Sequence, residues 1–71
     1  QGKEEIMDFK ESQIWKSEKH GSTITILWVE NDRISFKIES EDFDHTTEWR
    51  AVVLEQFIND HGFKLENTLE K

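Results

Sequence analysis

Residues 22–39, STITILWVENDRISFKIE, decide the fold, because they hold two strand patterns joined by a turn signal. The first half is rich in β-branched and aromatic residues, and the second half alternates apolar and polar side chains. Asn31 and Asp32 lie between the halves, and both residue types tolerate the left-handed backbone that a tight hairpin turn demands. The stretch therefore predicts an antiparallel hairpin.

A third strand precedes this hairpin, because residues 13–18 lead into a second turn signal at His20 and Gly21. The result is a three-stranded meander over residues 12–40. Loops with an even number of residues place Leu27 and Val29 opposite Phe36 and Ile34 on one apolar face. The opposite face then carries four further large apolar residues, namely Trp15, Ile24, Ile26 and Trp28.

The main helix is expected over residues 47–61. Thr46 or Thr47 can cap its start, and Gly62 stands where a left-handed C-terminal cap belongs. The predicted fold class is α+β, with an antiparallel meander of three or four strands packed by this helix and an optional short helix in residues 3–11. Residues 63–66 offer the fourth strand. The predicted core consists of Ile14, Leu27, Val29, Ile34, Phe36, Ile38, Val53 and Phe57.

Seventy-one residues fit one small domain. Residues 1–2 are interpreted as a remnant of processing or of recombinant expression, and residues 66–71 are expected to fray. The absence of cysteine fits a cytoplasmic protein, and no apolar run is long enough to span a bilayer. The predicted sheet is apolar on both faces, and one helix covers only one of them. We therefore expect either Ile6 and Phe9 or a second copy, in a symmetric homodimer, to cover the other face.

Residue patterns for catalysis, metals and cofactors are missing from the sequence. His20, His45 and His61 are far apart and have no cysteine beside them, so zinc is not expected. Asp42 and Asp44 start like a calcium loop, but the later ligand positions do not match. No glycine-rich elbow or phosphate loop is present. We expect a non-enzymatic protein with no metal and no cofactor.

Acidic charge is concentrated in one short segment. Residues 39–48 contain Glu39, Glu41, Asp42, Asp44 and Glu48 without any Lys or Arg, and contribute −5 of the net charge of −7. One interpretation is a solvated loop that keeps the protein soluble. The other is mimicry of a phosphate backbone. Alternate residues of a strand lie about 6.6 Å apart, and this spacing is comparable to the separation of successive phosphates along a nucleic-acid strand. Since exposed ion pairs contribute only about 0–1 kcal/mol each, tight binding also needs an apolar anchor.

In size, acidity and lack of active-site chemistry the chain resembles the small phage-encoded host-takeover proteins that mimic DNA. The resemblance implies an inhibitor, in the host cytoplasm, of a basic nucleic-acid-binding protein such as a histone-like nucleoid protein, a nuclease or a polymerase component. Direct binding to nucleic acid or an anionic membrane is not expected at this net charge. The alternative is an acidic partner domain without mimicry, such as an immunity protein against a basic toxin or a subunit of a larger complex.

Overall fold

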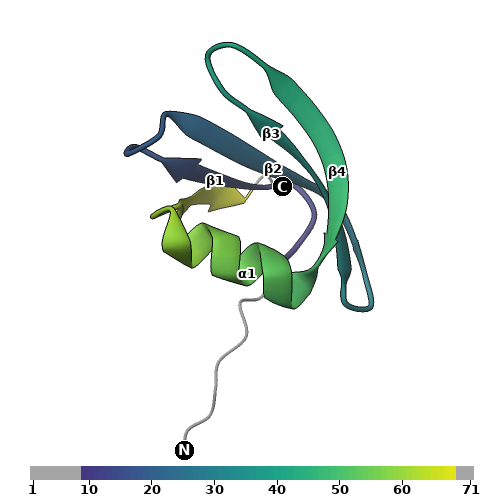
Figure 1. Cartoon of the computed structure of the whole chain (residues 1–71). Helices are drawn as coiled ribbons and strands as arrows, with labels where there is room; N and C mark the ends of the chain where they lie inside the picture. Colours follow the sequence, from purple (N-terminus) through teal and green to yellow (C-terminus); the bar gives the residue numbers. More distant parts are fainter. Residues whose placement is uncertain (1–8, 69–71) are drawn as a thin grey trace, which may run out of the picture.

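The computed structural model describes residues 9–68, which form five antiparallel strands and one helix. The chain runs as a four-stranded meander and then crosses through the helix to the opposite edge, giving the strand order β4-β3-β2-β1-β5. Figure 1 shows the helix lying across one face of the curved sheet. The elements are β1 (Gln13–Ser17), β2 (Ser22–Glu30), β3 (Arg33–Glu39), β4 (Asp44–Arg50), α1 (Ala51–Asp60) and β5 (Lys64–Thr68).

The prediction of three or four strands with a helix over residues 47–61 is wrong. Asp44–Arg50 forms β4, in which Trp49 lies opposite Ile34 of β3, and the helix begins only at Ala51. Arg50 stands at the N-cap and makes no side-chain capping bond. Instead, the Ala51 N–H donates to the Asp32 carbonyl at 2.6 Å. A tertiary contact with the β2–β3 turn therefore satisfies the first N–H of a helix that has no side-chain cap.

The C-terminal end of α1 follows the prediction. Gly62 has φ +69°, in the left-handed region that glycine adopts readily. The Phe63 N–H donates to the Ile58 carbonyl at 3.0 Å, and the Gly62 N–H donates to the Asn59 carbonyl at 3.4 Å. These two bonds form a Schellman motif, which ends the helix and turns the chain toward β5. Glu66 belongs to β5, so the expected fraying does not begin there.

A β-bulge in β2 changes which residues share a face. Ile26 pairs with Phe36, and Trp28 pairs with Ser35, so Leu27 is an extra residue in the ladder. Directly opposed residues in antiparallel strands project to the same side of the sheet. The bulge therefore puts Ile26 with Phe36 on the face that α1 covers, and leaves Trp28 on the outer face.

The core accordingly differs from the predicted one. Ile34 and Phe36 are buried as predicted, while Ile38 and Phe57 pack against the core from partly buried positions. Ile14 is only half-buried. The prediction is wrong for the exposed side chains of Leu27, Val29 and Val53. The buried apolar residues are Phe9, Trp15, Ile24, Ile26, Ile34, Phe36, Leu54, Ile58 and Phe63.

Phe9 packs beside β1, with its ring centroid 5.8 Å from that of Trp15. Phe9 thus covers Trp15 within the core, on the face that α1 covers, and not on the outer apolar face that was expected. Ile6 and residues 3–8 of the optional N-terminal helix lie outside the described residues, and residues 9–11 are not helical. Among residues 9–68, no helix has the length and apolar character needed to cross a membrane.

Candidate interaction site at the β3–β4 hairpin

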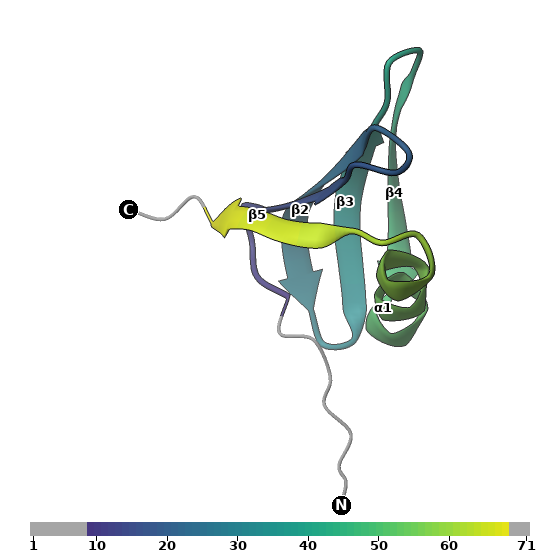
Figure 2. The same ribbon diagram turned by 90° about the vertical axis from the view of Figure 1, so that its left-hand side faces the viewer.

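The acidic segment forms the tip of the hairpin between β3 and β4. Glu39 and Asp44 are the last paired residues, and the loop between them is closed by a 2.8 Å bond from the Ser40 N–H to the Phe43 carbonyl. The chain thus reverses direction within the segment, and the acids do not follow one extended strand. Figures 1 and 2 both show this hairpin extending past the neighbouring strands.

The two faces of the hairpin differ in chemistry near the tip. Glu39 and Asp44 are opposed in the ladder and belong to the outer face, together with Lys37. Phe43 has 55% of its surface exposed and lines a hollow beside α1, on the helix face. The tip therefore presents carboxylates and an exposed aromatic ring within a few residues of each other.

Ion pairing divides the five acidic residues that the sequence grouped together. Glu48 lies five residues after the tip loop and accepts a hydrogen bond from Arg33 at 2.8 Å. Glu39 lies 3.9 Å from the Lys37 ammonium group. Glu41, Asp42 and Asp44 make no ion pair with any residue from 9 to 68 and are exposed. The structure therefore brings four of the five acids to the tip and leaves three of them without an ion pair to the residues that it describes.

The apolar surface predicted for a second copy is not available as one face. Trp15, Ile24 and Ile26 are buried in the core of the single chain. Only Trp28 is exposed, at 37%, because the bulge at Leu27 moves it to the opposite side from Ile26. The single chain therefore does not present the continuous apolar surface from which the homodimer was predicted.

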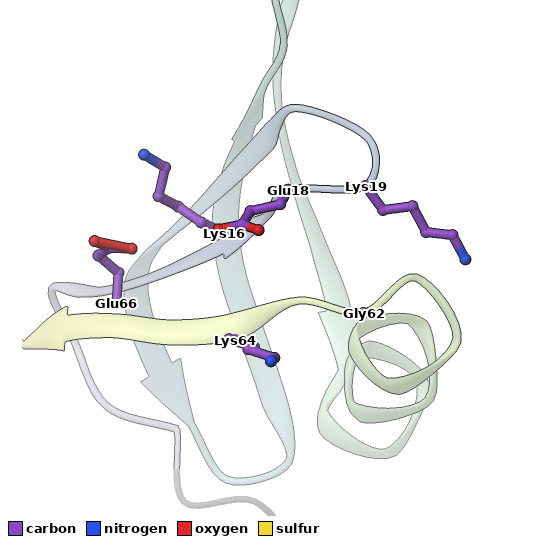
Figure 3. A pocket seen from close by; sticks show the side chains of 6 residues that line it. All are labelled: Lys16, Glu18, Lys19, Gly62, Lys64 and Glu66. Carbon is purple, nitrogen blue, oxygen red and sulfur yellow. The ribbon is translucent and has the colours of Figure 1, made fainter.

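A charged hollow of about 360 Å³ lies where β1 and β5 meet the turn after α1. In Figure 3 the side chains of Lys16 and Lys19 extend toward opposite sides of this hollow. Lys64 lies opposite Lys16 in the ladder, yet Figure 3 shows the two ammonium groups pointing apart. Because these amines do not converge on one point, the hollow offers no built anion site. The other lining residues are Glu18, Gly62 and Glu66.

Two histidines that are far apart in the sequence meet beside the end of α1. The Nδ1 atom of His61 lies 3.3 Å from the Nε2 atom of His20. Ser17 holds both residues in place, because its hydroxyl donates to the His61 carbonyl at 2.8 Å and accepts from the His20 N–H at 3.3 Å. His45 lies in β4, opposite Ile38 of β3. Within residues 9–68, no group of three or more potential metal ligands occurs.

The sequence reading missed Phe43 and the second hollow that it lines. This hollow, of about 350 Å³, also involves His20, Phe57, His61 and Phe63. The signal for Phe43 was available, since a lone aromatic between Asp42 and Asp44 is unusual for a solvated loop. The sequence could not predict the contact between His20 and His61, because it depends on the path of the chain through α1 to the opposite edge of the sheet.

Comparisons with protein families, curated proteins and solved structures found no match for this chain.

Proposed function

We propose that this protein is a non-enzymatic acidic interaction protein of the DNA-mimic kind. Its β3–β4 hairpin occupies the basic nucleic-acid-binding surface of a partner protein. One observation carries the proposal: Glu41, Asp42 and Asp44 are exposed without ion-pair partners among residues 9–68, at the tip of a projecting hairpin. Unpaired carboxylates at such a tip can approach a Lys- or Arg-lined groove without first breaking internal ion pairs.

The compact tip favours a short groove. Glu39 and Asp44 face each other across one strand spacing of about 4.8 Å, and Glu41 and Asp42 close the turn between them. The acids therefore form a cluster that replaces a few neighbouring phosphates of one strand. Glu48 does not join this cluster, because Arg33 neutralises it and Arg50 lies close to it in the same strand.

Charge alone gives fast and salt-sensitive association, since each exposed ion pair contributes only about 0–1 kcal/mol. Stable binding needs desolvated apolar contact as well, and aromatic side chains are favoured for that purpose. Phe43 supplies such a side chain at the same tip. We therefore assign the carboxylates to attraction and orientation, and Phe43 to the short-range contact.

The test is affinity capture of the partner from the native host, with two variants of equal charge. The first carries Glu41→Gln, Asp42→Asn and Asp44→Asn at the tip. The matched control carries Glu18→Gln, Glu30→Gln and Glu66→Gln. These exposed residues lie in the β1–β2 turn, in β2 and in β5, respectively. The proposal predicts a basic nucleic-acid-binding partner that the control still captures and the tip variant does not. Equal capture by both variants would remove the hairpin from the interface.

A further inference from the structure

An apolar hollow lies directly behind the acidic tip. It has a volume of about 350 Å³ and is bounded by the hairpin, the C-terminal end of α1 and the β1–β2 turn. Ile38 and Phe43 come from the hairpin side, and Phe57, His61 and Phe63 come from the helix and the residues after it. A hollow of this size has room for one large side chain of a partner.

Aromatic rings form much of the wall on the helix side. The ring of Phe57 lies 4.5 Å from that of His61 and 5.7 Å from that of Phe63, measured between centroids. His20 continues the row, with its ring centroid 5.0 Å from that of His61. The faces of the Phe57 and Phe63 rings carry negative charge density, which attracts a cation placed over them.

Carboxylates lie next to the hollow in the chain. Asp42 and Asp44 flank Phe43, which lines the hollow, and both are exposed without ion partners among residues 9–68. On the other side, α1 presents its C-terminal end, which carries partial negative charge, and Asp60 stands in its last turn. No basic residue lies in that last turn. The combination of aromatic walls and carboxylates beside Phe43 favours a cationic occupant with a flat or apolar body.

We infer that this hollow receives an arginine side chain from a basic protein partner. A guanidinium group stacks on aromatic faces, stays charged, and donates several hydrogen bonds to carboxylates at the same time. A lysine ammonium is more strongly hydrated and does not stack, while a phenylalanine carries no charge. This inference rests on the proposed function, because it identifies what the partner inserts beside the acidic tip.

The test titrates three acetylated and amidated pentapeptides, KGRGK, KGKGK and KGFGK, into the ¹⁵N-labelled protein at low salt. The first two peptides have the same charge and differ only in the central side chain. We expect KGRGK to bind about threefold more tightly than KGKGK, the gain typical of one exposed cation–π contact. The amide signals of Phe43, Phe57 and His61 should shift with KGRGK and move little with KGKGK.

Two variants make the assignment specific. Phe43→Ala should abolish the advantage of KGRGK over KGKGK and leave the melting temperature nearly unchanged, because Phe43 is exposed. Val52→Ala, at an exposed apolar site of α1 away from the hollow's lining, should leave the advantage intact.

Three outcomes overturn the inference, and they separate it from the proposed function. Equal binding of KGRGK and KGKGK, with shifts confined to Glu41 and Asp42, removes the arginine site and leaves the acidic hairpin function standing. Tightest binding by KGFGK shows that the hollow takes an aromatic anchor instead. No shift with any cationic peptide removes the proposed function together with the inference.

Discussion

Ile26 and Trp28 are two residues apart in β2, yet they lie on opposite sides of the sheet. In a regular strand they would share a face, because side chains alternate with a period of two. The extra residue, Leu27, places Ile26 opposite Phe36 and Trp28 opposite Ser35, which are adjacent in β3. Ile26 is consequently buried under α1, and Trp28 is exposed on the outer face.

Deletion of Leu27 tests the importance of this bulge. The deletion makes Ile26 and Trp28 adjacent, so a continuous ladder keeps Ile26 opposite Phe36 and Trp28 opposite Ser35. We therefore expect the deletion to lower the free energy of unfolding by less than about 1.5 kcal/mol. Urea denaturation followed by tryptophan fluorescence measures the change. Leu27→Ala should also cost little, since Leu27 is 42% exposed. A loss of several kcal/mol on deletion would argue against Leu27 being the extra residue of the ladder.

Phe36 is the central test of the core. Its side chain is 1% exposed, and its ring centroid lies 5.0 Å from that of Trp49 in β4. Phe36→Ala should lower the free energy of unfolding by about 3–5 kcal/mol, because the truncation leaves a cavity. Val53→Ala, at an exposed position of α1, should change it by less than about 0.5 kcal/mol. A Phe36→Ala variant that melts like the parent would refute this core.

Ser17 connects the start of the β1–β2 turn to the end of α1. Its buried hydroxyl bonds both the His61 carbonyl and the His20 N–H. Ser17→Ala leaves these groups without that partner, so we expect a loss of about 1–3 kcal/mol in the free energy of unfolding. The signals of the His20 and His61 rings should also move in an NMR spectrum. Ser22→Ala, in the following strand, serves as the control. If both changes lower the free energy of unfolding by the same small amount, Ser17 does not stabilise the contact between the β1–β2 turn and α1.

Neutralisation of the acidic tip should separate binding from folding. Asp42→Asn with Asp44→Asn, followed by Glu39→Gln with Glu41→Gln, should lower the affinity for the partner and leave the melting temperature nearly unchanged. Neither Asp42 nor Asp44 makes an ion pair with residues 9–68, and Glu39 makes only a 3.9 Å contact. Calorimetry gives both quantities. A fall in the melting temperature of several degrees would mean that the cluster has a structural role.

Added salt should weaken the complex, as neutralisation of the acidic tip does. Charges on exposed groups are screened over about 10 Å at 0.1 M ionic strength. The association rate of the parent protein should therefore fall steeply between about 0.05 M and 0.3 M sodium chloride, while that of the neutralised variant should change little. Stopped-flow kinetics measures the two slopes. Parallel slopes would show that charges elsewhere on the molecule steer the encounter.

The sequence predicted the features that depend on neighbouring residues. The turn at Asn31, which has φ +55°, the glycine turn at Gly21 and the cap at Gly62 all occur where expected. These positions need a left-handed backbone, and their residue types reveal it directly. The central hairpin was predicted for the same reason, and Val29 pairs with Ile34 as expected.

The errors arose where distant contacts override local preference. Thr46 and Thr47 suit both a helix cap and a strand, and pairing of β4 with β3 selected the strand. The bulge at Leu27 carries no marker residue such as glycine, so the prediction put Ile24 and Ile26 on the outer face and Leu27 on the helix face. The acidic segment was correctly placed on the surface. Its division between the tip and Glu48 depended on the ion pair with Arg33, which no sequence spacing could supply.

Competition between this protein and DNA for the captured partner tests the central claim most directly. The partner is saturated with fluorescently labelled duplex DNA, and the unlabelled protein is added while anisotropy is recorded. The account predicts full displacement of the DNA by the parent protein, and much weaker displacement by the Glu41→Gln, Asp42→Asn, Asp44→Asn variant. A partner that binds this protein and DNA simultaneously, with no loss of affinity for either, would contradict the account.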